Sequence, residues 1–258
     1  MTTLAVHSGQ LTLRGLRALL RQPVYVAITL VQPMIWLLLF GQLFRRIVDL
    51  PGFGGGSYIT YLAPGVVVMT ALFASGWSGM GFIQDMERGV MDRLLVSPVR
   101  RGAMMIGSLA YQGAVTVIQS LIILVVGAVM GARYPSGLVG LLVVVTCAVL
   151  VSASFASFSN ALALLLRTQE ALIGVANFLV LPLTFLSSTM IAFDLVPPWI
   201  QGIDTYNPID WAVVASREAL TASPDWSIVL WRLALLAACT AAMGWLATRA
   251  FRAYQRSV

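Results

Sequence analysis

Residues 84–102 read QDMERGVMDRLLVSPVRRG and hold seven charged side chains, out of 16 basic and 10 acidic residues in the whole chain. The uncharged intervals on either side, residues 50–84 and 102–132, are 35 and 31 residues long. A helix needs about 20 apolar residues to cross a bilayer. The stretch therefore indicates a charged loop between two membrane spans.

The rest of the chain repeats this pattern. Of 258 residues, 59% are hydrophobic and 10% are charged, whereas soluble domains carry about 25% charged residues. The apolar intervals predict six spans, at residues 24–44, 58–83, 103–130, 137–166, 171–192 and 227–248. The alternating segments of about ten residues that form outer-membrane barrels are not visible. The sequence thus predicts an all-α membrane protein with one permease domain over residues 1–258, a six-helix core at 24–248 and a tail at 249–258.

Arginine placement predicts the orientation, because basic residues concentrate in short cytoplasmic loops. With the N-terminus in the cytoplasm, eleven arginines near span ends lie inside and four lie outside. Both termini and the charged loop are then cytoplasmic. No leader peptide is expected, since the first 22 residues have no apolar core followed by a small-residue cleavage site.

Residues 11–21, LTLRGLRALLR, predict an amphipathic helix within a cytoplasmic segment at 1–22. Leu13, Leu16 and Leu20 can share one face, while Arg14, Arg17 and Arg21 recur on another. Such a basic helix lies in the headgroup region and contacts anionic lipid. It serves either as a topological anchor or as a mechanical lever.

The charged loop predicts a second amphipathic helix within residues 84–98. Met86, Val90 and Leu94 fall four apart, and Asp85, Arg88 and Asp92 have the spacing of ion pairs on a helix surface. Ser97-Pro98 ends the helix, because the residue before proline avoids the helical region. The mixed charges favour docking on a soluble partner, with a solvated face as the alternative.

Residues 194–226 predict two short helical pieces on the outer side, at 198–203 and 209–220, separated by Asn207-Pro208. Neither piece is long enough to cross a bilayer. They form either a re-entrant region at 195–222, which needs protein cover for its broken backbone, or a surface loop with aromatic anchors.

The chain shows few signs of catalysis. Ser78 lies in GWSGMG, but the only histidine is His7 and there is no lysine to act as its base. Gly76 and Gly79 are better explained by close helix packing. Cys147 and Cys239 lie inside predicted spans, without metal-ligand company, and no G-x-x-x-x-G-K-[ST] phosphate loop occurs. ATP would therefore have to be hydrolysed by another chain.

Polar residues inside the spans are usually bonds between helices, and some could instead line a substrate route. They include Ser108, Gln112, Thr116 and Gln119 in the third span, five residues of the fourth span from Ser152 to Asn160, and Asn177, Thr184 and Ser188 in the fifth. Every acidic residue lies outside the predicted spans, which disfavours an ion-coupled carrier. A channel is disfavoured because no filter-like segment is repeated.

These features together resemble the permease subunits of type 2 ABC exporters, above all the daunorubicin-resistance and nodulation-factor permeases. The likeness covers the basic N-terminal helix, the six spans, MERGVMDRLLVSPVRR in the charged loop, and the region from LSSTMIAFDLVPPW to NPIDWAVVASREAL. The short loop PGFGGGS after the first span lacks the large outer domain of some relatives, which argues against substrate capture by such a domain.

The resemblance implies a fold and a set of functional residues. The fold is the type 2 ABC exporter fold, with an interfacial N-terminal helix, a cytoplasmic coupling helix and an outer re-entrant hairpin. The resemblance assigns ATPase coupling to Glu87, Arg88, Val90, Asp92, Arg93, Leu94, Ser97 and Pro98. It assigns the connecting helix to Arg14, Arg17 and Arg21, the re-entrant exit region to Pro198, Trp199, Asn207, Pro208 and Arg217, and a candidate pathway to Asn177, Thr184 and Ser188.

The expected function is that of the membrane subunit of an ATP-driven exporter of amphipathic compounds such as drugs, lipids or polyketide-like metabolites. Its expected partners are a separate ABC ATPase that holds ATP and Mg²⁺, a second permease, and membrane lipid, with no nucleic acid and no cofactor in this chain. The expected location is the bacterial cytoplasmic (inner) membrane. Alternatives are a stand-alone ion-coupled secondary carrier and a membrane scaffold or intramembrane enzyme.

Overall fold

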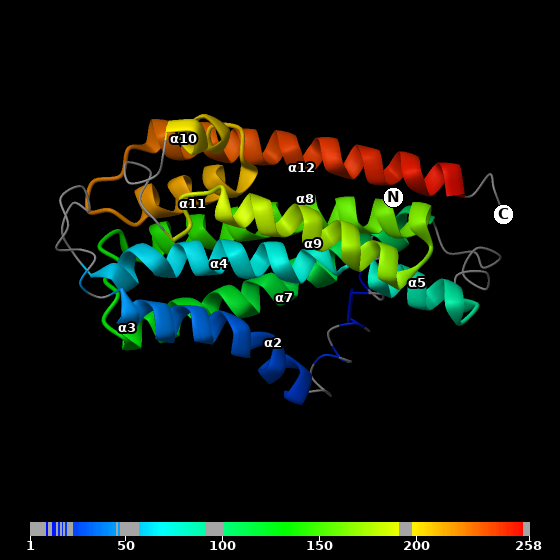
Figure 1. Cartoon of the computed structure of the whole chain (residues 1–258), viewed down its shortest axis with the longest axis horizontal. Helices are drawn as coiled ribbons and strands as arrows, with labels where there is room; N and C mark the ends of the chain where they lie inside the picture. Colours follow the sequence, from blue (N-terminus) through cyan, green and yellow to red (C-terminus); the bar gives the residue numbers. More distant parts are fainter. Residues whose placement is uncertain are drawn as a thin grey trace.

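The computed structural model describes residues 9, 12, 13, 15, 17, 19, 23–44, 46, 57–90, 101–190 and 198–254. Within these residues all regular structure is helical. The long helices run side by side along the longest axis, with α10 and α11 at one end and α5 at the other (Figure 1).

The helices follow the predicted spans closely. A helical run begins with α2 (Pro23–Ile35), passes through a π-helical segment, η1 (Trp36–Phe40), and ends in α3 (Gly41–Leu43). The other helices are α4 (Tyr58–Gly76), α5 (Met80–Glu87), α7 (Arg101–Val129), α8 (Gly137–Leu166), α9 (Gln169–Phe185), α10 (Pro198–Asp204), α11 (Pro208–Ala219) and α12 (Trp226–Tyr254). The two expected outer pieces thus appear as α10 and α11, and α12 extends into the expected tail.

Four helical stretches in the described residues are long and apolar enough to cross a membrane: Tyr58–Glu87, Met105–Val129, Gly137–Leu166 and Trp226–Arg252. The first and fifth expected spans appear as shorter apolar helices, Thr29–Leu43 and Gln169–Phe185. The fifth is short because the chain leaves the helix at Leu186, six residues after the buried Val180 of α9 and before the expected end at residue 192. The count of six crossings therefore stays a proposal.

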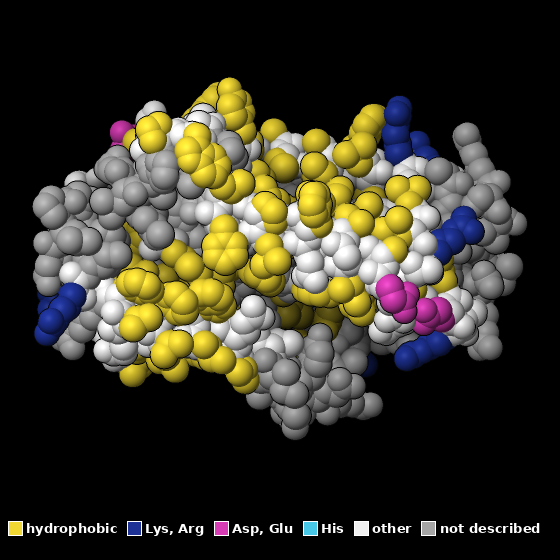
Figure 2. Space-filling view, viewed as in Figure 1, with side chains coloured by type: hydrophobic (Ala, Val, Ile, Leu, Met, Phe, Trp, Pro, Cys, Tyr) yellow, Lys and Arg dark blue, Asp and Glu magenta, His cyan; other side chains and the backbone are white. Residues whose placement is uncertain are grey.

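The centre of the bundle is α8, which contacts α4, α7, α9, α11 and α12. Three buried apolar clusters follow one another around it and contain Leu62, Leu72 and Leu164 respectively. Apolar side chains also cover the flank of the bundle, while charged side chains gather toward its two ends (Figure 2). This distribution is typical of a protein whose flank faces lipid.

Polar side chains inside the bundle join neighbouring helices, as the sequence predicted for most of them. The hydroxyls of Thr116 on α7 and Ser152 on α8 lie 2.9 Å apart. The hydroxyls of Ser154 on α8 and Thr240 on α12 lie 2.8 Å apart. Asn160 donates to Ser108 at 3.3 Å.

Candidate functional site

The end of α9 is the first feature of functional interest. With 17 residues, α9 is about 25 Å long at 1.5 Å per residue, shorter than the hydrocarbon core of about 30 Å. The chain then continues without regular helix through residues 186–190. Irregular backbone at membrane depth is tolerated only where protein covers it and pairs its polar groups.

Asn207 supplies part of that cover from the start of α11. Its side-chain amide nitrogen donates to the carbonyls of Leu183 and Leu186 at 2.8 and 2.7 Å. Its side-chain oxygen accepts from the Ile209 N–H at 3.0 Å and so caps α11, with Pro208 at the first helical position. An Asn-Pro pair suits this place because asparagine is a good N-cap and proline has no N–H to leave unpaired.

Arg217 lies three turns further along α11 and joins three segments of the chain. Its Nη2 donates to the Thr189 carbonyl at 2.8 Å, and its Nε donates to the Tyr61 carbonyl at 3.2 Å. Its guanidinium carbon lies 3.5 Å from the centre of the Tyr61 ring, a position that favours cation–π attraction. The planar fork of arginine can make these contacts at once, and a lysine could not.

Asp210 balances this positive charge. The Ser188 hydroxyl and the Ser188 N–H both donate to one carboxylate oxygen of Asp210, which is 3% exposed. Nη1 of Arg217 donates to the same hydroxyl at 3.4 Å. Ser188 therefore lies between a buried carboxylate and the guanidinium. We call Tyr61, Ser188, Thr189, Asn207, Asp210 and Arg217 the α9–α11 cluster.

Helix α4 closes the cluster from the other side. The phenol of Tyr61 donates to the Ser188 carbonyl and that of Tyr58 to the Met190 carbonyl, each at 3.1 Å. Gly65 lets the two backbones approach, since a Cβ there would lie 2.5 Å from the Thr189 carbonyl oxygen. The backbone after α9 is thus fixed by α4 and α11 together.

The re-entrant residues named from the sequence divide into two groups. Asn207 and Arg217 lie in the α9–α11 cluster, with Pro208 beside them. Pro198 and Trp199 begin α10 and are exposed, so they are placed to contact lipid headgroups or solvent.

Asp204, at the end of α10, is a second buried acid in this region. It is 1% exposed, and its Oδ1 has no hydrogen-bond partner in the described part of the chain. Burial, followed by the nearby charge of Asp210, raises the pKa of Asp204 from 3.8 to about 6. The folded protein therefore favours the neutral carboxyl.

This raised pKa predicts a pH-dependent stability. As pH rises from about 4 to about 6, the unfolded chain ionises at Asp204 before the folded chain does, so the folded state loses stability. We expect Asp204→Asn to raise the Tm by about 2–5 °C above pH 7, and we expect this gain to shrink toward pH 4. Thermal unfolding in detergent across this pH range measures it. Asp225→Asn, which changes an exposed carboxyl at the same end, is the control, and a gain from Asp204→Asn that is equal at all pH values would contradict the assignment.

The opposite end of the bundle contains a break between α4 and α5 at residues 77–79. The Ser159 hydroxyl of α8 donates to the Gly76 carbonyl at 2.6 Å and accepts from the Gly79 N–H at 3.0 Å. A Cβ on Gly79 would lie 2.3 Å from the Ser159 carbonyl oxygen. The close packing predicted for these glycines is confirmed, and it fixes α5 against α8.

Beyond this break, α5 carries the first predicted coupling residues. Phe82 and Ile83 are buried, and Met86 packs against the same apolar cluster as Leu164 and Leu172. Glu87 and Arg88 are exposed, and both carboxylate oxygens of Glu87 accept from Gln169 at the start of α9, at 3.0 and 3.2 Å. A patch of two exposed opposite charges is thus held to α8 and α9.

One helix through Met86, Val90 and Leu94 was the wrong expectation. Helix α5 ends at Glu87, and Gly89 has a φ of +64°. Glycine adopts this left-handed conformation without a Cβ penalty and so ends helices readily. A helical residue returns at Val90, which is half-buried. Asp92, Arg93, Leu94, Ser97 and Pro98 lie outside the described residues.

The N-terminal helix contacts α7 in the described positions. The Thr12 hydroxyl donates to the Gly107 carbonyl at 3.4 Å, and a Cβ on Gly15 would lie 2.7 Å from the Tyr111 ring. Leu19 is buried, whereas Leu13 and Arg17 are exposed. Arg14 and Arg21 lie outside the described residues.

The three candidate pathway residues, two in α9 and one in the segment after it, differ in surroundings. Asn177 is half-buried. Thr184 is buried and donates back to the Val180 carbonyl at 2.8 Å. Ser188 is bonded within the α9–α11 cluster. Tyr61, Thr189 and Asp210 were missed from the sequence, because only the fold brings them to this place. The one local signal was Asp210 three residues after Asn207.

The fold and these two end sites define a polytopic membrane protein whose irregular backbone is covered by its own side chains. Residues 8–221 match the ABC-2 type transporter family, so the chain belongs to that family and is an ABC transporter permease.

Curated relatives agree with this assignment. The chain is 33% identical over 202 residues to the transport permease ycf38 of Cyanophora paradoxa, across 76% of this chain and 68% of that protein. It is 26% identical over 213 residues to the daunorubicin resistance ABC transporter permease protein DrrB1 of Streptomyces coeruleorubidus, across 80% and 72%. It is 27% identical over 200 residues to the inner membrane transport permease YadH of Escherichia coli K12, across 73% and 74%.

Proposed function

We propose that the chain is the membrane-spanning subunit of an ATP-driven exporter of amphipathic compounds, powered by a separate ATPase subunit that binds ATP and Mg²⁺. Membership of the ABC-2 type transporter family supports this proposal. The sequence offers no phosphate loop of its own. The relative DrrB1, named for daunorubicin resistance, supports an amphipathic substrate.

The observation that carries the proposal is the charged patch on α5. Glu87 and Arg88 are exposed at the end of a helix that is fixed to α8 and α9 by Ser159 and Gln169. A partner that moves this patch would move the packed helices with it. Charges at the rim of such an interface set partner choice and register.

The proposed topology has six crossings with both termini in the cytoplasm of a bacterial inner membrane. The C-terminal ends of α5, α8 and α12 all carry arginines, as cytoplasmic helix ends do. These arginines are Arg88, Arg167, Arg249 and Arg252. The α9–α11 cluster would then lie in the outer leaflet, near the substrate exit. A second permease would complete the path, with Asn177 among the residues that face it.

An ion-coupled carrier is the competing function, and the buried Asp210 is the observation that favours it. Ion-coupled transport uses intramembrane acids that gain and lose a proton or ion. Asp210, however, is already bonded to Ser188 and balanced by Arg217.

The test of the proposed function is daunorubicin uptake into inside-out proteoliposomes. We expect uptake with ATP when the permease and its ATPase are both present, and none with the permease alone under a proton or sodium gradient. Gradient-driven uptake by the permease alone would support the carrier instead.

The charged patch gives a sharper prediction. We expect Glu87→Arg or Arg88→Glu to reduce the ATPase that co-purifies with the permease by about tenfold, since like charges would then face each other across the interface. Arg133→Glu, an exposed arginine at the opposite end, is the control and should leave co-purification unchanged. Equal ATPase recovery from all three variants would contradict the assignment of this patch.

A further inference from the structure

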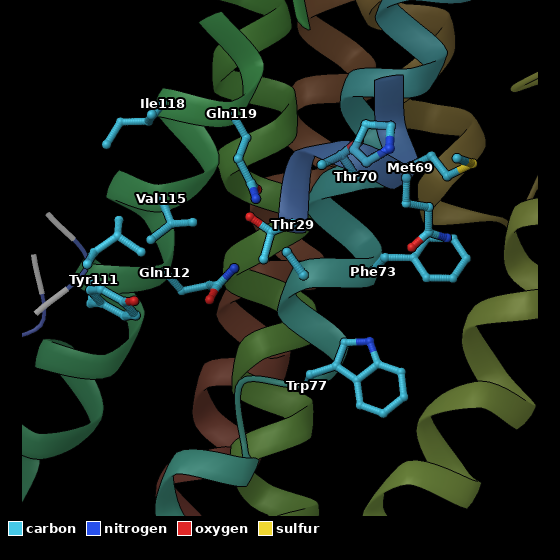
Figure 3. Close-up of a pocket in the computed structure, with 14 residues that line it drawn as sticks. Thr29, Met69, Thr70, Phe73, Trp77, Tyr111, Gln112, Val115, Ile118 and Gln119 are labelled. Carbon is cyan, nitrogen blue, oxygen red and sulfur yellow. The ribbon is translucent and has the colours of Figure 1, made fainter. Parts of the chain in front are cut away.

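A cavity of about 270 Å³ lies between α2, α4 and α7. It contains none of the α9–α11 cluster, the charged patch or the candidate pathway residues, although Trp77 of its lining belongs to the break between α4 and α5. Figure 3 shows its two kinds of lining: Gln112 and Gln119 extend from α7 toward α4, and the rings of Phe73 on α4 and of Trp77, just after α4, lie beyond the α4 ribbon in this view. Thr29 of α2 and Met69 of α4 also line it.

The two glutamines are unlike the other polar residues of α7. Gln112 and Gln119 are 7% and 4% exposed. The amide nitrogen of Gln112 and the amide oxygen of Gln119 have no hydrogen-bond partner in the described part of the chain. Thr116, between them on the same face, is bonded to Ser152. The face thus contains one residue that joins helices and two cavity-lining residues that each hold a buried, unpaired amide atom.

An unpaired buried polar atom costs about 1–3 kcal/mol. Two such atoms in side chains that line one cavity therefore point to a partner from outside the chain. An amide group offers both a donor and an acceptor, so this holds whichever way each side chain is turned. Seven residues separate the glutamines, or about 10 Å along the helix. A molecule that spans two helical turns can bond to both.

The chemistry of the lining restricts the occupant. None of the described residues that line the cavity is acidic or basic, so they offer a charged group no counter-ion, and burying one there would have a high cost. Helix α4 and the residue after it offer two aromatic rings and a methionine, which favour a flat apolar body. The occupant is thus uncharged, with a hydrogen-bonding group at one side and an aromatic or acyl part at the other.

The position of α2 offers a route from the bilayer. Helix α2 packs only lightly on α4 and α7, and its first turns diverge from the bundle (Figure 1). An uncharged amphipathic molecule dissolves in the bilayer, so it can reach the cavity sideways between helices without passing through water.

We propose that this cavity binds one uncharged amphipathic molecule, with its amide, hydroxyl or carbonyl groups on Gln112 and Gln119 and its apolar body against Phe73 and Trp77. Binding does not depend on ATP or on the proposed export function, because every lining residue belongs to this chain. If the protein did not export daunorubicin, binding in this cavity would still be expected. If the cavity bound nothing, the proposed export function would be unaffected.

The test is photo-crosslinking of the full-length permease in lipid nanodiscs with 4-benzoylbenzamide, an uncharged probe with one primary amide and two aromatic rings. The activated ketone inserts into nearby C–H bonds, so we expect a saturable adduct on the peptide that contains Met69. Peptide mass spectrometry locates and quantifies it.

Three variants separate the contributions. Gln112→Leu and Gln119→Leu keep the side-chain volume and remove the hydrogen bonds, so each should reduce saturable labelling about tenfold. Ala74→Phe should abolish labelling by filling the cavity while both glutamines remain. Gln42→Leu, an exposed glutamine of α3, is the matched control and should label as the parent does.

Competition identifies the source of the natural occupant. Displacement of the probe by dioleoylglycerol but not by benzanilide would assign the site to a bilayer lipid, and the reverse would assign it to a dissolved aromatic compound. Labelling that is not saturable, or that is equal in the parent and both leucine variants, would overturn the proposal and leave the cavity to water alone.

Discussion

Replacing Arg217 with methionine is expected to lower the Tm of the permease by about 10 °C, the largest effect of any single change described here. The substitution keeps most of the apolar stem but removes the donors to the Tyr61 and Thr189 carbonyls and the positive charge that balances Asp210. A buried charge that loses its partner costs about 3–5 kcal/mol. For a chain of this size each 1 kcal/mol lowers the Tm by about 2–4 °C.

Thermal unfolding in detergent measures this effect, and two variants make it specific. Arg133→Met removes an exposed arginine at the same end and should change the Tm by no more than about 1 °C. The double variant Arg217→Met with Asp210→Asn should be less destabilised than the sum of the two single variants, because each single change leaves the other group unbalanced. Additive effects would mean that Arg217 and Asp210 act independently.

Adding a single methyl group at Gly79 is expected to displace α5 from α8. The Cβ of Gly79→Ala would lie 2.3 Å from the Ser159 carbonyl oxygen and 2.9 Å from the Ala163 Cβ. Gly79 has φ −64° and ψ −18°, a conformation open to every residue, so the contact alone causes the effect. Overpacking of this kind costs about 1–3 kcal/mol. We therefore expect a Tm lower by about 5 °C and ATP-driven uptake reduced at least about tenfold.

Gly81→Ala, two residues further on in the first turn of α5, is the matched control. A Cβ on Gly81 meets nothing within 4 Å, and alanine favours a helix over glycine. The Gly81 variant should match or slightly exceed the parent in Tm and retain uptake. If both alanine variants behave alike, the contact with Ser159 is not what couples α5 to the bundle.

Features with a local cause were predictable from the sequence. The apolar intervals predicted the long helices because their length is fixed by the bilayer. Asn207-Pro208 predicted the start of α11, since both residues act within one turn. The glycines before α5 predicted close packing, although the partner, Ser159, lies 80 positions away from Gly79 and could not be identified.

Features with a distant cause were not predictable. Ser188 was expected near a substrate path, but Asp210 and Arg217 of another helix surround it. Gln112, Thr116 and Gln119 share one face, and spacing could not show that one of them meets Ser152 while the other two meet a cavity. The end of the helix at Gly89 was missed for a different reason. The helical spacing of the apolar residues Met86 and Val90 continues across Gly89, although the helical backbone does not.

The break between α4 and α5 determines which helix responds first to movement at the charged end. In an unbroken helix a push on α5 would travel up α4 as axial strain. Here the break at residues 77–79 interrupts the helix, and the Ser159 hydroxyl of α8 forms hydrogen bonds to the residues on both sides of the break, Gly76 and Gly79. A displacement of α5 is therefore delivered sideways to α8, which in the described part of the chain touches α4, α7, α9, α11 and α12, so these helices should move together.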